Sequence, residues 1–73
     1  MSVSAPFSDI ERMLKDCAPG STWRLTNHSR KVNYDKKTYK SLPKHKDIEV
    51  GHIRKMIRHL GINIECARKY LPV

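Results

Sequence analysis

His28 is the residue of this chain best placed for chemistry, because it stands within the most basic segment of the sequence. Between Thr22 and Lys46 there are eight Lys or Arg residues against one acid, Asp35. A neutral imidazole can accept a proton near neutral pH, and fixed cations attract phosphate groups. This combination indicates acid–base chemistry on a phosphodiester, with His28 as the catalyst. The structural alternative is a histidine that only occupies the tip of a hairpin.

The positive charge of the chain is concentrated in this one segment. The formal net charge is +8, and residues 22–46 contribute +7 of it. A surface that serves only solubility usually mixes charges of both signs, whereas a localised surplus predicts a polyanionic partner, with nucleic acid favoured. The candidate RNA-binding residues are Arg24, Asn27, Arg30, Lys31, Lys44 and His45.

The remaining histidines do not form a recognisable metal site. His52 and His59 lie two helical turns apart, so their backbones are separated by roughly 10 Å, which is too far for shared zinc ligation. His45, which follows Pro43, could line a site or simply bond to local backbone, and both interpretations stay open. The thin core of a 73-residue chain leaves little room for a large organic cofactor, so we expect neither cofactor nor metal.

Three short segments have the alternation of apolar and polar residues that is typical of strands. They are Thr22 to Thr26, Arg30 to Tyr34 and Thr38 to Leu42. Their links are short, which favours antiparallel hairpins. In the first segment Trp23 and Leu25 share one face, which predicts a half-buried strand. The expected role of Trp23 is core packing rather than base stacking.

The face that His28 occupies is an open question at this point. Strict alternation would place it on the same face as Arg30, Val32 and Tyr34, of which the last two are typical core residues. A bend or bulge near Ser29 would turn the imidazole outward.

Helices are expected before and after the three strands along the sequence. The expected ranges are Ser8 to Cys17, Ile53 to Leu60 and a short C-terminal helix capped by Asn63. Ser8 and Glu11 match a capping box, and Gly61 is a typical residue at a helix C-terminus. The chain is therefore predicted to be a single α+β domain spanning residues 1–73, with residues 1–6 flexible and the order α-β-β-β-α. A three-stranded antiparallel sheet would pack one face on the helices and leave the basic face open.

Cys17 and Cys66 match no metal-binding or redox spacing, and each falls at an apolar helical position. They are expected to be buried free thiols. The first ten residues lack the pattern of a secretory signal, and no apolar run is long enough to span a bilayer. These features predict a cytoplasmic protein that does not associate with membranes.

Three motifs in this order resemble the HicA family of bacterial toxins, the ribonuclease half of HicA–HicB toxin–antitoxin pairs. Thr26-Asn27-His28 is similar to the family's Gly-Ser-His or Ser-Asn-His element, and Leu42-Pro43-Lys44-His45 to its Pro-x-His element. The segment from Gly51 to Ile62 is similar to its glycine-led helix that ends in Leu-Gly-Ile. The resemblance covers nearly the whole chain, although Thr26 stands where many members have glycine.

The resemblance implies a fold like that of double-stranded RNA-binding domains and a role as the toxin of a type II toxin–antitoxin system. It implies an endoribonuclease (mRNA interferase) that cleaves mRNA without a metal, acts in stress responses and uses His28 as its catalytic residue. It also implies a HicB-type antitoxin, which we expect to cover His28 and the basic sheet face.

A single histidine leaves the second proton transfer unassigned, and Lys31, Lys44 or His45 could protonate or stabilise the leaving group. Arg30 and Lys31 are expected to hold the RNA backbone. Two non-enzymatic alternatives remain: a non-catalytic RNA-binding module of the same α-β-β-β-α fold, and an interaction protein whose basic face binds an acidic partner.

Overall fold

The computed structural model describes residues 3–73, which form an α+β domain with two small sheets. The elements along the chain are β1 (Ser4–Pro6), α1 (Phe7–Cys17), β2 (Thr22–Leu25), β3 (Arg30–Tyr34), β4 (Lys37–Leu42), β5 (Asp47–Glu49), α2 (Val50–Leu60) and α3 (Ile64–Ala67). The central order α1-β2-β3-β4-α2 and the short third helix confirm the expected element order. None of the helices among these residues has the length and apolar character needed to cross a membrane.

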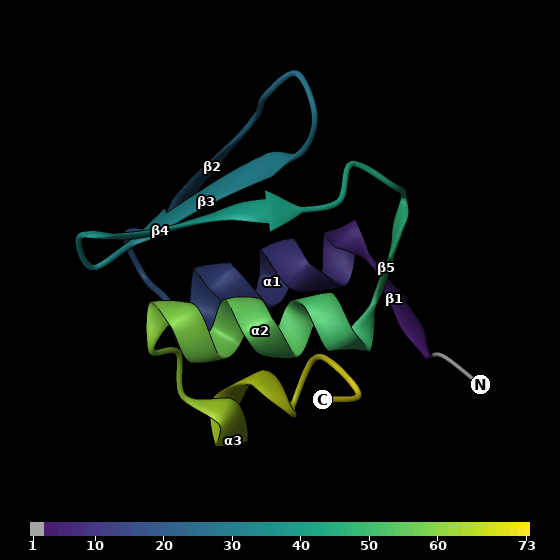
Figure 1. The fold of residues 1–73 in the computed structure, drawn as a ribbon. Coiled ribbons are helices and arrows are strands. Elements are labelled where there is room, and N and C mark those ends of the chain that lie inside the picture. The colour runs from purple at the N-terminus through teal and green to yellow at the C-terminus, as the bar shows by residue number, and fades with distance from the viewer. Residues whose placement is uncertain (1–2) are drawn as a thin grey trace.

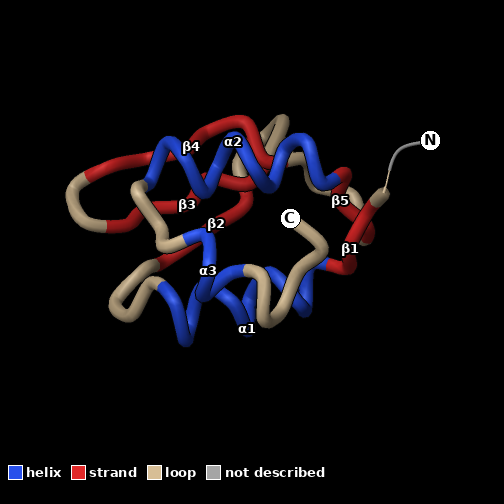
Figure 2. Tube along the Cα trace, turned by 90° about the horizontal axis from the view of Figure 1, so that it is seen from below, coloured by secondary structure: helices blue, strands red, loops and turns tan. Residues whose placement is uncertain are grey.

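The elements are arranged in layers. Strands β2, β3 and β4 form an antiparallel sheet in that spatial order, and the two long helices lie beneath one face of it (Figure 1). The view from below shows α1 and α2 separated across the molecule, with α3 and the C-terminal tail between them (Figure 2). One face of the sheet is therefore packed on helices and the other is left open.

Within the segment 1–6, which was expected to be flexible, Ser4–Pro6 form strand β1. Strand β1 pairs with β5 in antiparallel register, with Ala5 opposite Ile48, and both of these side chains are buried. The apolar side chain of Ala5, at 4% exposure, is what binds the segment to the core. Residues 1 and 2 of the expected flexible segment lie outside the described residues.

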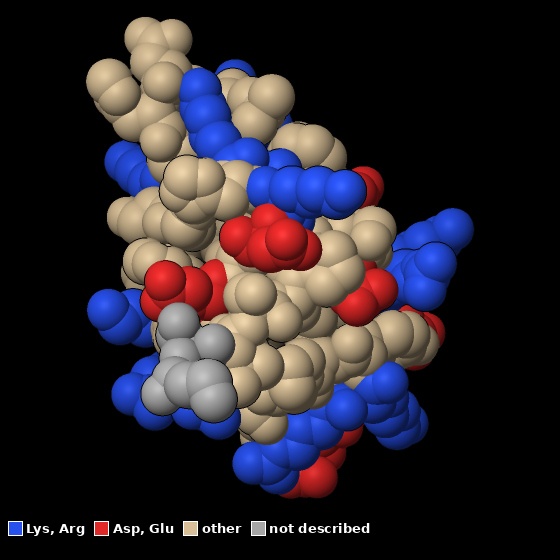
Figure 3. Space-filling view, turned by 90° about the vertical axis from the view of Figure 1, so that its right-hand side faces the viewer, with Lys and Arg blue, Asp and Glu red and all other residues tan. Residues whose placement is uncertain are grey.

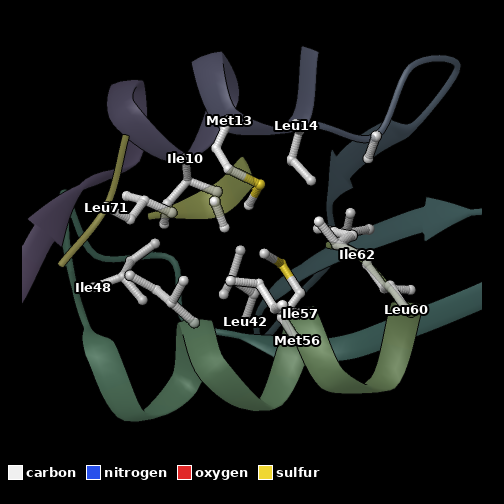
Figure 4. Close-up of a cluster of buried hydrophobic side chains, with 14 of the residues drawn as sticks. Ile10, Met13, Leu14, Leu42, Ile48, Met56, Ile57, Leu60, Ile62 and Leu71 are labelled. Atoms are coloured by element: carbon white, nitrogen blue, oxygen red, sulfur yellow. The ribbon is translucent and has the colours of Figure 1, made fainter. Parts of the chain in front are cut away.

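The core lies between the two long helices and the sheet. Helix α1 contributes Ile10, Met13 and Leu14, and the stripe of α2 faces it across the core, as Figure 4 shows. Val32 and Leu42 enter from the sheet, and both are fully buried. The core residues of the two helices recur at i, i+3 and i+4, so the amphipathic periodicity of the sequence was sufficient to predict them.

The ends of the helices agree with the sequence in two places and differ in one. Asn63 caps α3, because its side-chain oxygen accepts the N–H groups of Glu65 and Cys66 at 2.8 and 3.1 Å. Gly61 ends α2 in the left-handed region, with φ of 72°. The predicted Ser8–Glu11 capping box is wrong: α1 begins at Phe7, whose N–H donates to the carbonyl of Lys46 at 2.9 Å, and no side chain caps it.

Cys17 and Cys66 form a disulfide and are not the free, buried thiols that the sequence predicted. Both are half-buried, and their Cα atoms are 5.8 Å apart, a separation that suits a disulfide. The bond joins the last turn of α1 to α3. A second tether lies beside it, because the Tyr70 hydroxyl donates to the Asp16 carboxylate, and this hydrogen bond raises the pKa of Tyr70 above its ordinary value.

Strand β2 is more exposed than the predicted half-buried strand. Trp23 is 38% exposed and Leu25 is 59% exposed, although both lie on the helix side of the sheet. Helix α2 packs on β4 at the opposite edge, so β2 extends beyond the area that the helices cover. There Trp23 contacts the ring of Phe7 edge to face, with centroids 4.6 Å apart, and the Arg30 guanidinium lies 5.9 Å from the Trp23 ring centroid.

Candidate functional site

The hairpin tip that carries His28 is organised by the side chain of Thr26. The Thr26 N–H donates to the carbonyl of Ser29 at 2.8 Å and closes the hairpin. The Thr26 hydroxyl donates to the same carbonyl and accepts the N–H of Ser29 at 3.1 Å. In residues 3–73 the non-glycine residues with positive φ are Asp35 and Lys36, so position 26 does not need the glycine of the similar family motif.

His28 and Asn27 form the exposed tip of this hairpin. The chain leaves strand geometry after Leu25 and resumes it at Arg30, so the alternation that would have turned His28 toward the core does not extend to it. The predicted bend is present, and the imidazole is accessible to a substrate.

A second loop lies against the base of this tip and brings the two sequence motifs together. Lys44, in the loop between β4 and β5, donates from Nζ to the carbonyl of Asn27 at 2.9 Å. The Ser29 hydroxyl donates to the carbonyl of Lys40 on β4. Figure 1 shows both loops at the same end of the sheet. The Lys44 ammonium is therefore fixed at the carbonyl of Asn27, the residue that precedes His28.

Arg30 holds the second loop in place and is not free on the open face. Its Nη1 donates to the carbonyls of Pro43 and His45 at 2.7 and 2.8 Å, and its guanidinium lies 3.8 Å above the Phe7 ring. Burial of the guanidinium lowers the pKa of Arg30 from its ordinary value, and the charge of Glu11 partly offsets this. The group nevertheless stays cationic at any physiological pH.

Arg30→Lys is expected to lower the free energy of unfolding by about 1–2 kcal/mol, because lysine cannot reach two carbonyls while stacking on an aromatic ring. Urea denaturation measures this loss. Arg24→Lys, on an exposed strand position, is the matched control and should change stability by less than about 0.5 kcal/mol. Equal effects of the two substitutions would contradict the structural role of Arg30.

The three strands of the main sheet carry a row of cations. Arg24 on β2 stands directly opposite Lys31 on β3. A bulge follows, because Arg30 pairs with Leu42 and Val32 with Tyr39, so Lys31 faces the two residues Lys40 and Ser41. Like charges placed opposite each other are destabilising, so this cation row (Arg24, Lys31 and Lys40) lowers the stability of the sheet. A bound anionic ligand would relieve the repulsion.

Acidic residues lie elsewhere in the molecule. None of the residues in β2, β3 or β4 is acidic. The end of the domain that carries β1 and β5 shows acidic side chains gathered across its middle, with basic side chains above and below them (Figure 3). This separation leaves the cation row electropositive, and such a surface attracts polyanions.

One group of metal-ligand types comes together within residues 3–73. The ligand atoms of Asp16, Cys17 and Cys66 lie within 4.8 Å of one another. The two sulfurs are bonded to each other and the carboxylate accepts the Tyr70 hydroxyl, so these atoms are engaged in tethering α3 to α1.

The predicted site residues thus fall into two groups and one exception. Asn27, His28, Lys44 and His45 lie in the two adjoining loops, and Arg24 and Lys31 lie on neighbouring strands. Arg30 is separate, since it supports the second loop from below. The sequence analysis missed Lys40, because its place opposite Lys31 depends on the bulge.

Comparison of the chain with known protein families, with curated proteins and with solved structures gives no match.

Proposed function

We propose that this protein is a metal-independent endoribonuclease that cleaves mRNA, with His28 as its acid–base catalyst, and that it acts as the toxin of a HicA–HicB-like system. The observation that carries the proposal is the exposed His28 at a hairpin tip beside the ammonium of Lys44. The cation row on the adjoining strands suits an RNA backbone, since phosphate contacts position a nucleic acid without reading its sequence.

The proposed reaction is a transesterification within the RNA. His28 accepts the proton of a ribose 2′-hydroxyl, the oxygen attacks the adjacent phosphorus, and the bond to the 5′-oxygen of the next nucleotide breaks. The products are a 2′,3′-cyclic phosphate and a 5′-hydroxyl end. The departing oxygen needs a proton, and negative charge accumulates on the phosphate oxygens in the transition state.

Lys44 is the best supported group for both tasks, because its ammonium can give the departing 5′-oxygen a proton and is itself left as the neutral amine. Its Nζ is held at the base of the tip by the Asn27 carbonyl and remains exposed, so it can stabilise the phosphate charge electrostatically. Lys31 and His45 are the other candidates. The carbonyl of His45 is fixed by Arg30, which constrains its backbone.

The proposed fold is similar to that of double-stranded RNA-binding domains. The α1-β2-β3-β4-α2 order, with one open sheet face, supports this proposal. A HicB-type antitoxin would neutralise such a toxin by covering His28 and the cation row. Cytoplasmic action follows from the proposed substrate.

Incubation of the purified protein with an unstructured RNA in EDTA tests the activity. Cleavage is expected, and an RNA with 2′-deoxyribose at the cleaved nucleotide should resist, because the attacking hydroxyl is missing. Absence of cleavage of both RNAs, with binding retained, would favour the non-catalytic RNA-binding module.

Arg24→Ala combined with Lys31→Ala is expected to weaken RNA binding and to reduce its dependence on salt. Each phosphate contact to a single strand contributes about 0.7 to the slope of log K against log[salt], so loss of both should lower it by about 1.4. Fluorescence anisotropy over a range of salt concentrations measures the slope. Lys69→Ala combined with Arg54→Ala removes the same charge from exposed positions outside the sheet and should leave the slope unchanged.

A purely double-stranded RNA-binding module is less well supported by the same structure. Asp47 and Glu49 directly precede α2, and repulsion between these carboxylates and phosphates disfavours RNA at that helix N-terminus.

A further inference from the structure

The outer edge of β2 has backbone groups that no other strand uses. The Thr26–Ser29 pair is hydrogen-bonded, and hydrogen-bonded and non-hydrogen-bonded pairs alternate along an antiparallel ladder. The N–H and C=O groups of Leu25 and Trp23 therefore point away from β3. β2 is an edge strand of the three-stranded sheet, and all four of its residues are exposed.

The same two residues carry the largest exposed apolar side chains of the sheet. Trp23 is 38% and Leu25 is 59% exposed. A groove of about 440 Å³ adjoins the strand, between α1 and the loop that follows it, and is lined by Leu14, Ala18 and Trp23 among others. Edge strands that combine free backbone groups with apolar side chains are templates for pairing with another chain.

Charge around this edge selects the kind of chain that would pair. Arg24 lies on β2 itself, and Arg12 and Lys15 line the adjoining groove. Glu11 also lines it, and Asp9 lies 3.9 Å from Arg12 in an exposed ion pair, so three cations lie near two acids around this edge. We propose that the open edge of β2 binds an extended acidic segment of a partner protein, which adds a fourth strand to the sheet.

A second copy of this chain is a poorer occupant. Two edges paired antiparallel would bring Arg24 of each copy close together, and each domain carries a net charge of +8. Strand addition is a common mode of peptide recognition, in which main-chain bonds provide affinity and side-chain contacts provide specificity. The inference concerns a different surface from the His28 loop and does not depend on RNA cleavage.

Titration of the ¹⁵N-labelled protein with a hexapeptide of alternating Glu and Val tests the proposal. The expected result is slower hydrogen exchange at the amides of Trp23 and Leu25, with shifts confined to β2 and the groove. A peptide with Lys in place of Glu should bind at least about tenfold more weakly, because it repels Arg24 and its neighbours. A peptide N-methylated at alternate positions should not protect the two amides.

Leu25→Lys is expected to weaken binding of the acidic peptide by about tenfold, since a lysine on an edge strand opposes strand addition. Val3→Lys is the matched control. Val3 is also exposed, at 55%, and its replacement adds the same charge at a position away from β2. The proposal would be overturned if the peptide did not bind at about 1 mM, or if both variants lost affinity for it equally. Protection of the same amides by RNA would also overturn it. A dimer that Leu25→Lys dissociates would show that a second copy is the occupant, which also overturns it.

Discussion

Replacement of His28 with alanine is expected to lower the rate of RNA cleavage by at least about 100-fold, the usual contribution of a positioned acid–base group. The side chain is exposed at the hairpin tip, whose hydrogen bonds come from Thr26 and Ser29. The substitution should therefore leave the folded structure and the affinity for RNA nearly unchanged. Initial rates on a labelled RNA, together with anisotropy binding curves, measure both quantities.

His52→Ala provides the matched control, because it removes an imidazole from α2, outside the two loops of the site. Its cleavage rate should stay within about twofold of the wild type. A wild-type rate for His28→Ala would exclude catalysis by this residue. A parallel loss of binding and cleavage would instead give His28 a role in RNA affinity.

Loss of the disulfide has the largest expected effect on stability. The bond closes a segment with a sequence separation of 49, and the chain-entropy relation gives about 4 kcal/mol for a loop of that length. For so small a domain this corresponds to a fall in Tm of roughly 15–30 °C. Calorimetry of Cys17→Ala combined with Cys66→Ala measures the change.

The wild type treated with dithiothreitol is the natural comparison, since it breaks the same bond without a change of sequence. Its Tm should fall toward that of the double variant, and both free thiols should then react with iodoacetamide. An unchanged Tm in both samples would show that the hydrogen bond from Tyr70 to Asp16 and the core contacts hold α3 in place by themselves. Cytosolic reductants keep most thiols reduced. At the proposed site of action, the stability of the dithiol form therefore decides whether the domain stays folded.

Local pattern was sufficient to predict most of the fold. The positions of α1 and α2 followed from apolar residues at helical spacing, such as Ile10, Met13 and Leu14, and the three main strands followed from alternation. Asn63 marked a helix start because its side chain accepts backbone N–H groups, and Gly61 marked a helix end because glycine adopts a positive φ without strain. The exposed position of His28 was predicted only as one of two possibilities.

Features that depend on distant segments were not predictable from the sequence. The pairing of Ala5 with Ile48 and the bond between Cys17 and Cys66 join residues more than forty positions apart. The contacts of Arg30 were likewise not predicted: it was expected to bind RNA, and in the structure it also donates to the carbonyls of Pro43 and His45. The proposed catalytic assignment combines the sequence motifs with the exposed position of His28 near the Lys44 ammonium.

The position of the C-terminal tail also has a consequence for the timing of synthesis. Ala67 and Leu71 are buried in the core, at 0% and 3% exposure, and Cys66 supplies half of the disulfide. A chain that has not yet been extended to these residues during synthesis therefore has an incomplete core, and a product truncated before them would not assemble the two loops on a stable scaffold.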